Sequence, residues 1–158
     1  MKVTIYSDGS ARGNPDGPGG YGVILRCLDK NGNTVEREKS AGYKKTTNNR
    51  MELMGVIVGL ESLTRPCDVE IVSDSKYVID AFNQHWIDNW QKNNWRKSDK
   101  KPVLNSDLWK RLLKAKEAHN VTFTWVKGHE GHEENERCDR LAVKAALSDT
   151  LLDDSVTS

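Results

Sequence analysis

The chain lacks the features that mark membrane, secreted and zinc-binding proteins. No apolar run approaches the roughly 20 residues needed to cross a bilayer, and residues 1–10 lack the long apolar region of a signal peptide. The three cysteines are scattered without Cys-x-x-Cys spacing, which argues against a disulfide framework or a zinc site. We therefore expect a protein of the reducing cytoplasm with no membrane segment.

An excess of charge of one sign is also missing. The sequence has 24 Lys and Arg and 23 Asp and Glu, so the net charge of +1 does not by itself indicate nucleic-acid binding. The distribution is more informative, because residues 86–101 hold three of the five tryptophans and more basic than acidic side chains. This segment is typical of a nucleic-acid contact. The acidic, weakly apolar residues 149–158 are expected to form a frayed, flexible tail.

Internal repeats and interdomain linkers are absent, so residues 1–148 are expected to form a single domain. The hydrophobic patterns predict strands and helices in alternation: strands over residues 2–7, 21–29, 34–43, 68–74 and 121–126, and helices over residues 46–63, 75–85, 105–119 and 134–148. Residues 12–22 are interpreted as a turn-rich loop, and residues 86–101 show no clear period. Three strands followed by alternating helix and strand predict an α/β fold with a mixed sheet and packed helices.

Two of the expected strands end in the same pair of residues, Ser-Asp, at Asp8 and Asp74. Ligands of parallel sheets bind beyond the carboxyl ends of the strands, so parallel neighbours would bring both carboxylates close together. Two such groups repel unless one takes up a proton or a hard divalent cation neutralises them. The alternative is that Asp74 caps the following helix. That alternative is weaker for Asp8, because Gly and Pro follow it rather than a helix.

Two further acids occupy positions that face an expected core. Glu52 lies among apolar neighbours, and Asp139 shares a helix face with Ala142, Val143 and Ala146. Each acid alone is more often a tolerated residue at the edge of a core, with its charge reaching solvent. Together with Asp8 and Asp74, however, the two acids favour a metal site, because a buried acid needs a partner.

His129 lies in a glycine-flanked loop after the fifth strand, where a mobile general base or proton shuttle could sit. The alternative is an ordinary surface histidine. His129 and His132 do not form an H-E-x-x-H pattern, and acids outnumber soft ligands, so zinc is discounted.

Five stretches in order form a specific pattern: YSDGSARGNPDGPGGYG, TTNNRMELMGVIVGLE, VSDSKYV, KPVLNSDLW and WVKGHEGHEENERCD. Together they resemble bacterial type 1 ribonuclease H over residues 2–147. The resemblance implies an α/β fold with a mixed five-stranded sheet, three antiparallel strands plus parallel strands, and helices on both faces. It also implies an endonuclease that hydrolyses the RNA strand of RNA/DNA hybrids and leaves 5′-phosphate and 3′-hydroxyl ends.

The resemblance also implies the roles of the acids. The family's four catalytic and metal-binding acids fall on Asp8, Glu52, Asp74 and Asp139, which would hold two Mg²⁺ ions, with Mn²⁺ able to substitute. Asp8 is expected to bridge both ions, with Glu52 and Asp74 on one and Asp139 on the other. The mobile catalytic histidine of the family falls on His129.

Hybrid binding is expected of a second set of residues that match the family pattern. The RNA strand, marked by its 2′-hydroxyls, would be contacted by Gly9, Ala11, Asn14, Asn48, Asn49 and Lys76. The DNA strand would be contacted by a phosphate pocket and by the handle, which is residues 86–104; the residues concerned are Lys45, Thr47, Asn105 and Trp90. Asn48 and Asn49 could instead cap a helix. Trp86, Trp90 and Trp95 could instead belong to the core, and we expect Trp86 to be core and Trp90 to be exposed.

The chain departs from the family pattern at four positions. Asp16 adds a residue to the glycine-rich loop, and Lys45 replaces a common arginine, which loses bidentate phosphate geometry. Lys76 replaces a common glutamine, and Glu130 follows His129 where a small residue is usual. We expect Glu130 to raise the pKa of that histidine.

Two other functions compete with this interpretation. One is a nuclease or strand transferase of the wider superfamily that acts on DNA, which would share the acids but lack the asparagine set and the handle. The other is a hybrid-binding module without catalysis, which would lack one or more acids. The expected partner is an RNA/DNA hybrid bound by a monomer, with no membrane and no small-molecule cofactor.

Overall fold

The computed structural model describes residues 1–12, 17–127 and 133–154. Five strands and five helices make up these ranges: β1 (Lys2–Ala11), β2 (Gly17–Leu28), β3 (Thr34–Thr46), α1 (Asn48–Glu61), β4 (Asp68–Ser73), α2 (Lys76–Asn83), α3 (Trp86–Lys92), α4 (Ser106–Lys116), β5 (Asn120–Trp125) and α5 (Glu133–Ala146). None of these helices is long and apolar enough to cross a membrane.

One mixed sheet has the strand order β3-β2-β1-β4-β5. β1 to β3 form an antiparallel meander, whereas β4 pairs in parallel with both β1 and β5. β1 alternates as a half-buried strand should, with Val3, Ile5 and Ser7 buried. The expected mixed five-stranded sheet is therefore confirmed.

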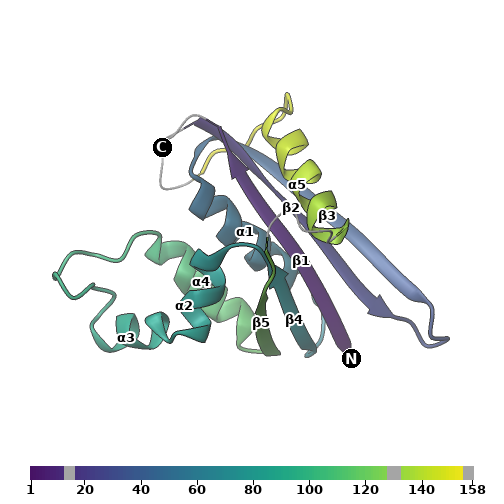
Figure 1. Cartoon of the computed structure of the whole chain (residues 1–158), viewed down its shortest axis with the longest axis horizontal. Coiled ribbons are helices and arrows are strands. Elements are labelled where there is room, and N and C mark those ends of the chain that lie inside the picture. The colour runs from purple at the N-terminus through teal and green to yellow at the C-terminus, as the bar shows by residue number, and fades with distance from the viewer. Residues whose placement is uncertain (13–16, 128–132, 155–158) are drawn as a thin grey trace.

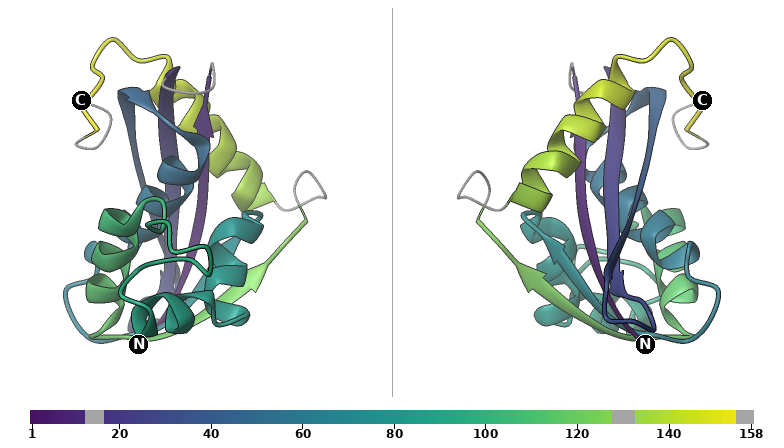
Figure 2. Two further views of the ribbon diagram at one scale, coloured as in Figure 1. Left: turned by 90° about the vertical axis from the view of Figure 1, so that its left-hand side faces the viewer. Right: turned by 90° about the vertical axis from the view of Figure 1, so that its right-hand side faces the viewer.

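Helices cover both faces of the sheet (Figure 1; Figure 2). α1 packs on β1 and β2 from one side and contacts α4 with another of its faces. It is consequently buried nearly all round, which explains its run of apolar residues. α5 packs alone on β2, β1 and β3 from the opposite side. Its buried face includes Cys138, Ala142 and Ala146.

Two glycines allow the helices to approach the strands at the level of Asp8. A Cβ at Gly9 would lie 2.4 Å from the backbone nitrogen of Glu52 in α1. A Cβ at Gly22, the partner of Asp8 across the β1–β2 ladder, would lie 2.3 Å from the carbonyl oxygen of Cys138 in α5. Only glycine fits such contacts with backbone atoms.

Several element boundaries differ from the sequence predictions. β1 continues past Asp8 to Ala11, and β2 begins at Gly17, within the stretch interpreted as a loop. The two strands extend each other, since Ala11 pairs with Gly19. The handle also contains a short helix, α3, which the sequence pattern did not predict.

The expectation of a frayed tail is wrong for the described residues of that segment. The backbone of Leu152 donates to Gly42 and accepts from Lys44, so the chain adds a short bridge to β3. Asp154 is only 8% exposed and is bonded to the Arg50 guanidinium. Residues 155–158 lie outside the described residues.

Candidate active site and hybrid-binding surface

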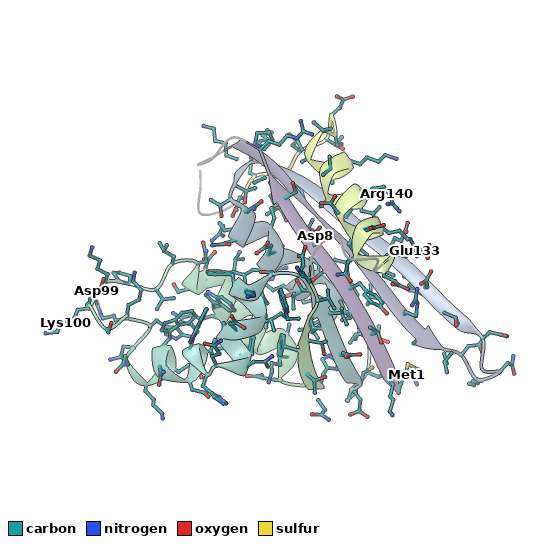
Figure 3. The ribbon with its side chains drawn as sticks, in the orientation of Figure 1. Met1, Asp8, Asp99, Lys100, Glu133 and Arg140 are labelled. Carbon is teal, nitrogen blue, oxygen red and sulfur yellow. The ribbon has the colours of Figure 1, made fainter. Side chains whose placement is uncertain are left out.

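Asp8 lies within β1, two residues beyond the last parallel pair of β1 and β4, Tyr6 with Val72. Its Oδ1 accepts a hydrogen bond of 2.9 Å from the Gly9 N–H. Burial raises the pKa of Asp8 to about 8, and the nearby charges of Asp74 and Asp139 add to the effect. Figure 3 shows Asp8 in the middle of the molecule, beside the sheet and near α5.

Asp74 follows directly after β4, as predicted. The interpretation of Asp74 as a helix cap is wrong, because the N-cap of α2 is Ser75, whose Oγ accepts from the Val78 N–H. The carbonyl of Asp74 accepts a 3.1 Å hydrogen bond from the indole N–H of Trp125 in β5. The position of Asp74 is therefore fixed by its contact with β5, and Asp74 does not cap α2.

Glu52 projects from α1 toward the same edge of the sheet. The Ser75 hydroxyl donates a 2.5 Å hydrogen bond to its Oε2. Burial raises the pKa of Glu52 to about 7; the Ser75 hydrogen bond opposes this shift and the charge of Asp74 adds to it. The residue that caps α2 thus also holds an acid that comes from α1.

Asp139 completes the group from α5. It lines a small pocket of about 150 Å³ together with Asp8 and Asp74; the other lining residues are Lys127, Asn135, Glu136 and Arg140. The pocket therefore brings together three of the four acids singled out in the sequence, from β1, the end of β4 and α5. The fourth, Glu52 of α1, lies close enough to Asp74 for that charge to raise its pKa.

Asn135 is a pocket residue that the sequence interpretation missed. Its buried Oδ1 accepts no hydrogen bond from any group in the described part of the chain. The available signal was its position four residues before Asp139, which places both side chains on one face of α5.

The donor set fits a hard divalent cation. Within the described ranges, no group of three or more His, Cys, Asp or Glu side chains forms a ready metal site. However, one pocket is lined by four carboxylates and by Asn135, whose Oδ1 has no hydrogen-bond partner among the described residues. Burial raises the pKa of Asp8, and the charges of Asp74 and Asp139 raise it further. Carboxylate and amide oxygens are the ligands that Mg²⁺ and Mn²⁺ prefer.

Comparison with known proteins identifies the family. The RNase H family model matches residues 1–147. The chain is 64% identical to the ribonuclease H of Lachnoclostridium phytofermentans, over 99% of each chain. The chain belongs to the ribonuclease H family. It is also 55% identical to the ribonuclease H of Photorhabdus laumondii, over 96% of this chain and 93% of that protein.

Solved ribonuclease H structures share the fold. LC9-RNase H1, a type 1 RNase H with the type 2 active-site motif, superposes with a TM-score of 0.84 at 33% identity, covering 99% of this chain and 79% of that chain. The N-terminal RNase H domain of a Mycobacterium tuberculosis protein gives a TM-score of 0.68 at 28% identity, with 92% and 93% covered. The expected family is confirmed. Its members degrade RNA in RNA/DNA hybrids, which disfavours the alternative of a DNA-directed enzyme.

Four residues of the expected ribonuclease H pattern lie outside the described residues: Asn14, Asp16, His129 and Glu130. Their expected roles stay predictions.

The asparagines expected in the minor groove do not cap α1. Thr47 is the N-cap, and its hydroxyl accepts from the Arg50 N–H. Asn48 Oδ1 instead accepts a 2.8 Å hydrogen bond from the Ala11 N–H, which ties the start of α1 to the end of β1. Asn49 is exposed. The capping alternative is therefore wrong for both asparagines.

Asn105 precedes α4 with a left-handed backbone (φ 61°) and makes no side-chain cap. Its Oδ1 accepts from Arg50 Nη1 and its Nδ2 donates to the Tyr77 hydroxyl, each at 3.1 Å. Thr47 belongs to the same corner, since it caps the helix that carries Arg50. Lys45 is exposed near the end of β3.

The handle tryptophans correct two expectations. Trp86 and Trp90 are both half-buried, so neither the core position expected of Trp86 nor the exposure expected of Trp90 is observed. Trp90 follows the buried Ile87 by three residues on α3, which turns its ring toward Trp109 at 5.5 Å between ring centroids. Figure 1 shows the loop after α3 extending away from the sheet.

Lys76, at the start of α2, lies over an aromatic ring. Its Nζ is 4.7 Å from the ring centroid of Trp125, which is 41% exposed. The same indole donates to the carbonyl of Asp74. Lys76, one of the four expected departures from the family pattern, thus makes a cation–π contact.

Proposed function

We propose that this ribonuclease H is a metal-dependent endonuclease that hydrolyses the RNA strand of RNA/DNA hybrids and leaves 5′-phosphate and 3′-hydroxyl ends. The observation that carries the proposal is the convergence of Asp8, Glu52, Asp74 and Asp139 from four elements on one edge of the sheet. A hybrid-binding module would have no need to keep four repelling carboxylates together.

The four acids would hold two Mg²⁺ ions, with Mn²⁺ as a substitute. When bound, two such ions activate a water and stabilise the leaving oxygen of an in-line displacement. The chain supplies their placement: the Gly9 N–H orients Asp8, and the Ser75 hydroxyl orients Glu52. His129, which lies outside the described residues, would move a proton or assist product release.

The two strands of the hybrid would be distinguished by different contacts. Residues where β1 meets the start of α1 would contact RNA 2′-hydroxyls: Gly9, Ala11, Asn48 and Asn49. Asn14, outside the described residues, would do the same. Because the Ala11 N–H already donates to Asn48, that amide would act by holding the asparagine rather than by touching RNA.

The DNA strand would lie on the other side of this junction. Thr47, Asn105 and Lys45 would bind one DNA phosphate, and Trp90 would pack on a deoxyribose with the part of its ring that is exposed. Lys76, beside Trp125, would contribute a charge near the RNA backbone rather than read a 2′-hydroxyl.

The test is a gel assay with one end-labelled RNA, offered alone, paired with RNA and paired with DNA. Wild type and Asp74→Asn are compared, each with Mg²⁺ or EDTA. We expect cutting of the hybrid alone, only with Mg²⁺, and its loss in the variant. Hybrid binding without cutting would support the non-catalytic module, and cutting of all three substrates would show that the strand-recognition roles are wrong.

A further inference from the structure

Arg50, in the first turn of α1, is a buried cation at which three separate parts of the chain meet. It is 2% exposed, and its five N–H donors are all used. Nε and Nη2 donate to the two oxygens of Asp154 at 2.8 and 2.9 Å. Nη1 and Nη2 donate to Asp107 at 3.0 and 2.8 Å, and Nη1 also donates to Asn105 Oδ1.

Asp154 reaches Arg50 because the chain after α5 crosses the molecule. Figure 2 shows this segment leaving α5 and passing over the end of the sheet to the opposite side. The Leu152 bridge to β3 anchors it on the way. At its end, Asp154 also accepts a 2.8 Å hydrogen bond from the hydroxyl of Thr46. We name residues 151–154 the strap.

Stability alone does not account well for this arrangement. Burying an ion pair costs desolvation energy that its attraction often only offsets, so an apolar cluster would stabilise the fold equally well. A planar guanidinium with fixed donors is better suited to holding several groups in one geometry. At this site, Arg50 holds the side-chain amide of Asn105.

Asn105 is held on both sides of its amide. Arg50 binds the oxygen, and the Tyr77 hydroxyl accepts from the nitrogen. Tyr77 is itself fixed by the indole N–H of the fully buried Trp109, at 3.1 Å. The orientation of the amide is thereby set, and its second N–H makes no hydrogen bond within the described residues. The Thr47 hydroxyl, which accepts from the Arg50 N–H, keeps its own proton to donate.

We propose that Asp154 and Arg50 are positioning residues for the DNA strand: the strap, through Arg50, holds Asn105 in the geometry that binds a DNA phosphate. The proposal deepens the proposed function and rests on its assignment of Asn105 and Thr47 to the DNA strand. Without the strap, the hybrid is held less tightly. The acid site, to which α1 contributes Glu52, is unchanged.

The experiment measures hybrid binding in EDTA, so that a protein that does not cleave still reports on the phosphate pocket. Hybrids carry one neutral methylphosphonate at successive DNA positions. Wild type, Asn105→Ala and Asp154→Asn are compared. The matched control is Asp153→Asn, an exposed neighbour (82%) paired only loosely with Lys44 at 3.7 Å.

For wild type and the control, a methylphosphonate at one particular DNA position should lower the affinity for the hybrid about tenfold. This is the effect expected from losing one charge-assisted hydrogen bond. Asn105→Ala and Asp154→Asn should bind the unmodified hybrid about tenfold more weakly and be insensitive to the modification at that position. In Mg²⁺, Asp154→Asn should raise KM and leave kcat within about twofold of wild type.

Two results would overturn the proposal. One is that the methylphosphonate still lowers the affinity of Asp154→Asn by the full wild-type factor at the DNA position where it no longer affects Asn105→Ala. The other is that no DNA position matters in wild type. If Asp154→Asn does not fold, Thr46→Val removes one of the strap's hydrogen bonds while Arg50 stays paired, and it should reduce the same penalty in part. Failure of the proposed cleavage is a separate outcome, because it would leave the binding results intact.

Discussion

At the scale of single residues, the site is defined by an acid that the fold makes costly to ionise. Asp8 is half-buried, and burial and the charges of Asp74 and Asp139 raise its pKa, while the hydrogen bond from the Gly9 N–H favours the charged form. A group with this environment destabilises the folded state whenever it is ionised. The cost is tolerated because the same carboxylates would be compensated by bound cations.

Asp8→Asn should therefore stabilise the protein without metal at alkaline pH. The folded-state pKa of about 8 lies above the ordinary value of 3.8, so wild type loses stability as pH rises from 3.8 to 8. In EDTA at about pH 8.5, the variant should melt at least about 3 °C higher, the equivalent of roughly 1 kcal/mol for a domain of this size.

Thermal unfolding at two pH values checks this expectation. The difference should shrink toward zero at about pH 3, below the ordinary value of 3.8, because Asp8 is then mostly protonated in both the folded and the unfolded state. It should also shrink at pH 8.5 when Mg²⁺ is added. Asp149→Asn, at an exposed position, is the control. An Asp8→Asn variant that melts at or below the wild-type temperature at pH 8.5 in EDTA would contradict the account of Asp8.

At the scale of elements, the site depends on how closely the helices dock on the sheet. Gly22 lets the backbone of α5 lie against β2 at Cys138, the residue before Asp139. The added Cβ of a larger residue would meet a carbonyl oxygen, which cannot rotate away. The position of Asp139 relative to Asp8 is consequently set by a glycine on a different strand.

Gly22→Ala should destabilise the fold by roughly 1–3 kcal/mol, as overpacking does. Because the displaced helix carries Asp139, cleavage of the hybrid should also slow, even under conditions where the variant is folded. Denaturant unfolding and single-turnover cleavage measure the two effects. Gly55→Ala, where the nearest side-chain atom lies at 3.3 Å, is the milder comparison. Equal effects of the two substitutions would argue against this explanation.

Elements governed by local pattern could be predicted from the sequence, and elements governed by distant contacts could not. The alternation in β1 and the apolar periodicity of α5 gave the right types of structure. The strap could not be predicted, because its acidic residues resemble a solvated tail until Arg50, 104 residues away, is in place. Gly20 and Gly22 of β2 fall in the stretch that the sequence predicts as a loop, because their role, to admit α5 against the strand, depends on a distant helix.

At the scale of the whole molecule, residues far apart in the sequence meet at one edge of the sheet. The four acids could be predicted because Glu52 and Asp139 lie among apolar residues and because Asp8 and Asp74 repeat one Ser-Asp pair after similar strand patterns. Asn135, Ser75 and Arg50 could not, because a polar residue on a helix is unremarkable until its partners are known.

Figure 3 places the handle tip, at Asp99 and Lys100, on the opposite side of Asp8 from α5, so the handle and the acid site can contact different parts of one duplex.

The most direct test of the four-acid site is single-turnover cleavage of an RNA/DNA hybrid by isosteric variants. Asp8→Asn, Glu52→Gln, Asp74→Asn and Asp139→Asn are compared with wild type and with Glu133→Gln, an exposed acid of α5. Each of the four should lower the Mg²⁺-dependent rate by at least about a hundredfold, comparable to losing one strong electrostatic contact in a transition state, while Glu133→Gln retains the wild-type rate. Full Mg²⁺-dependent cleavage by any one of the four would contradict the assignment of that acid, and cleavage by wild type in EDTA would contradict the metal-dependent mechanism itself.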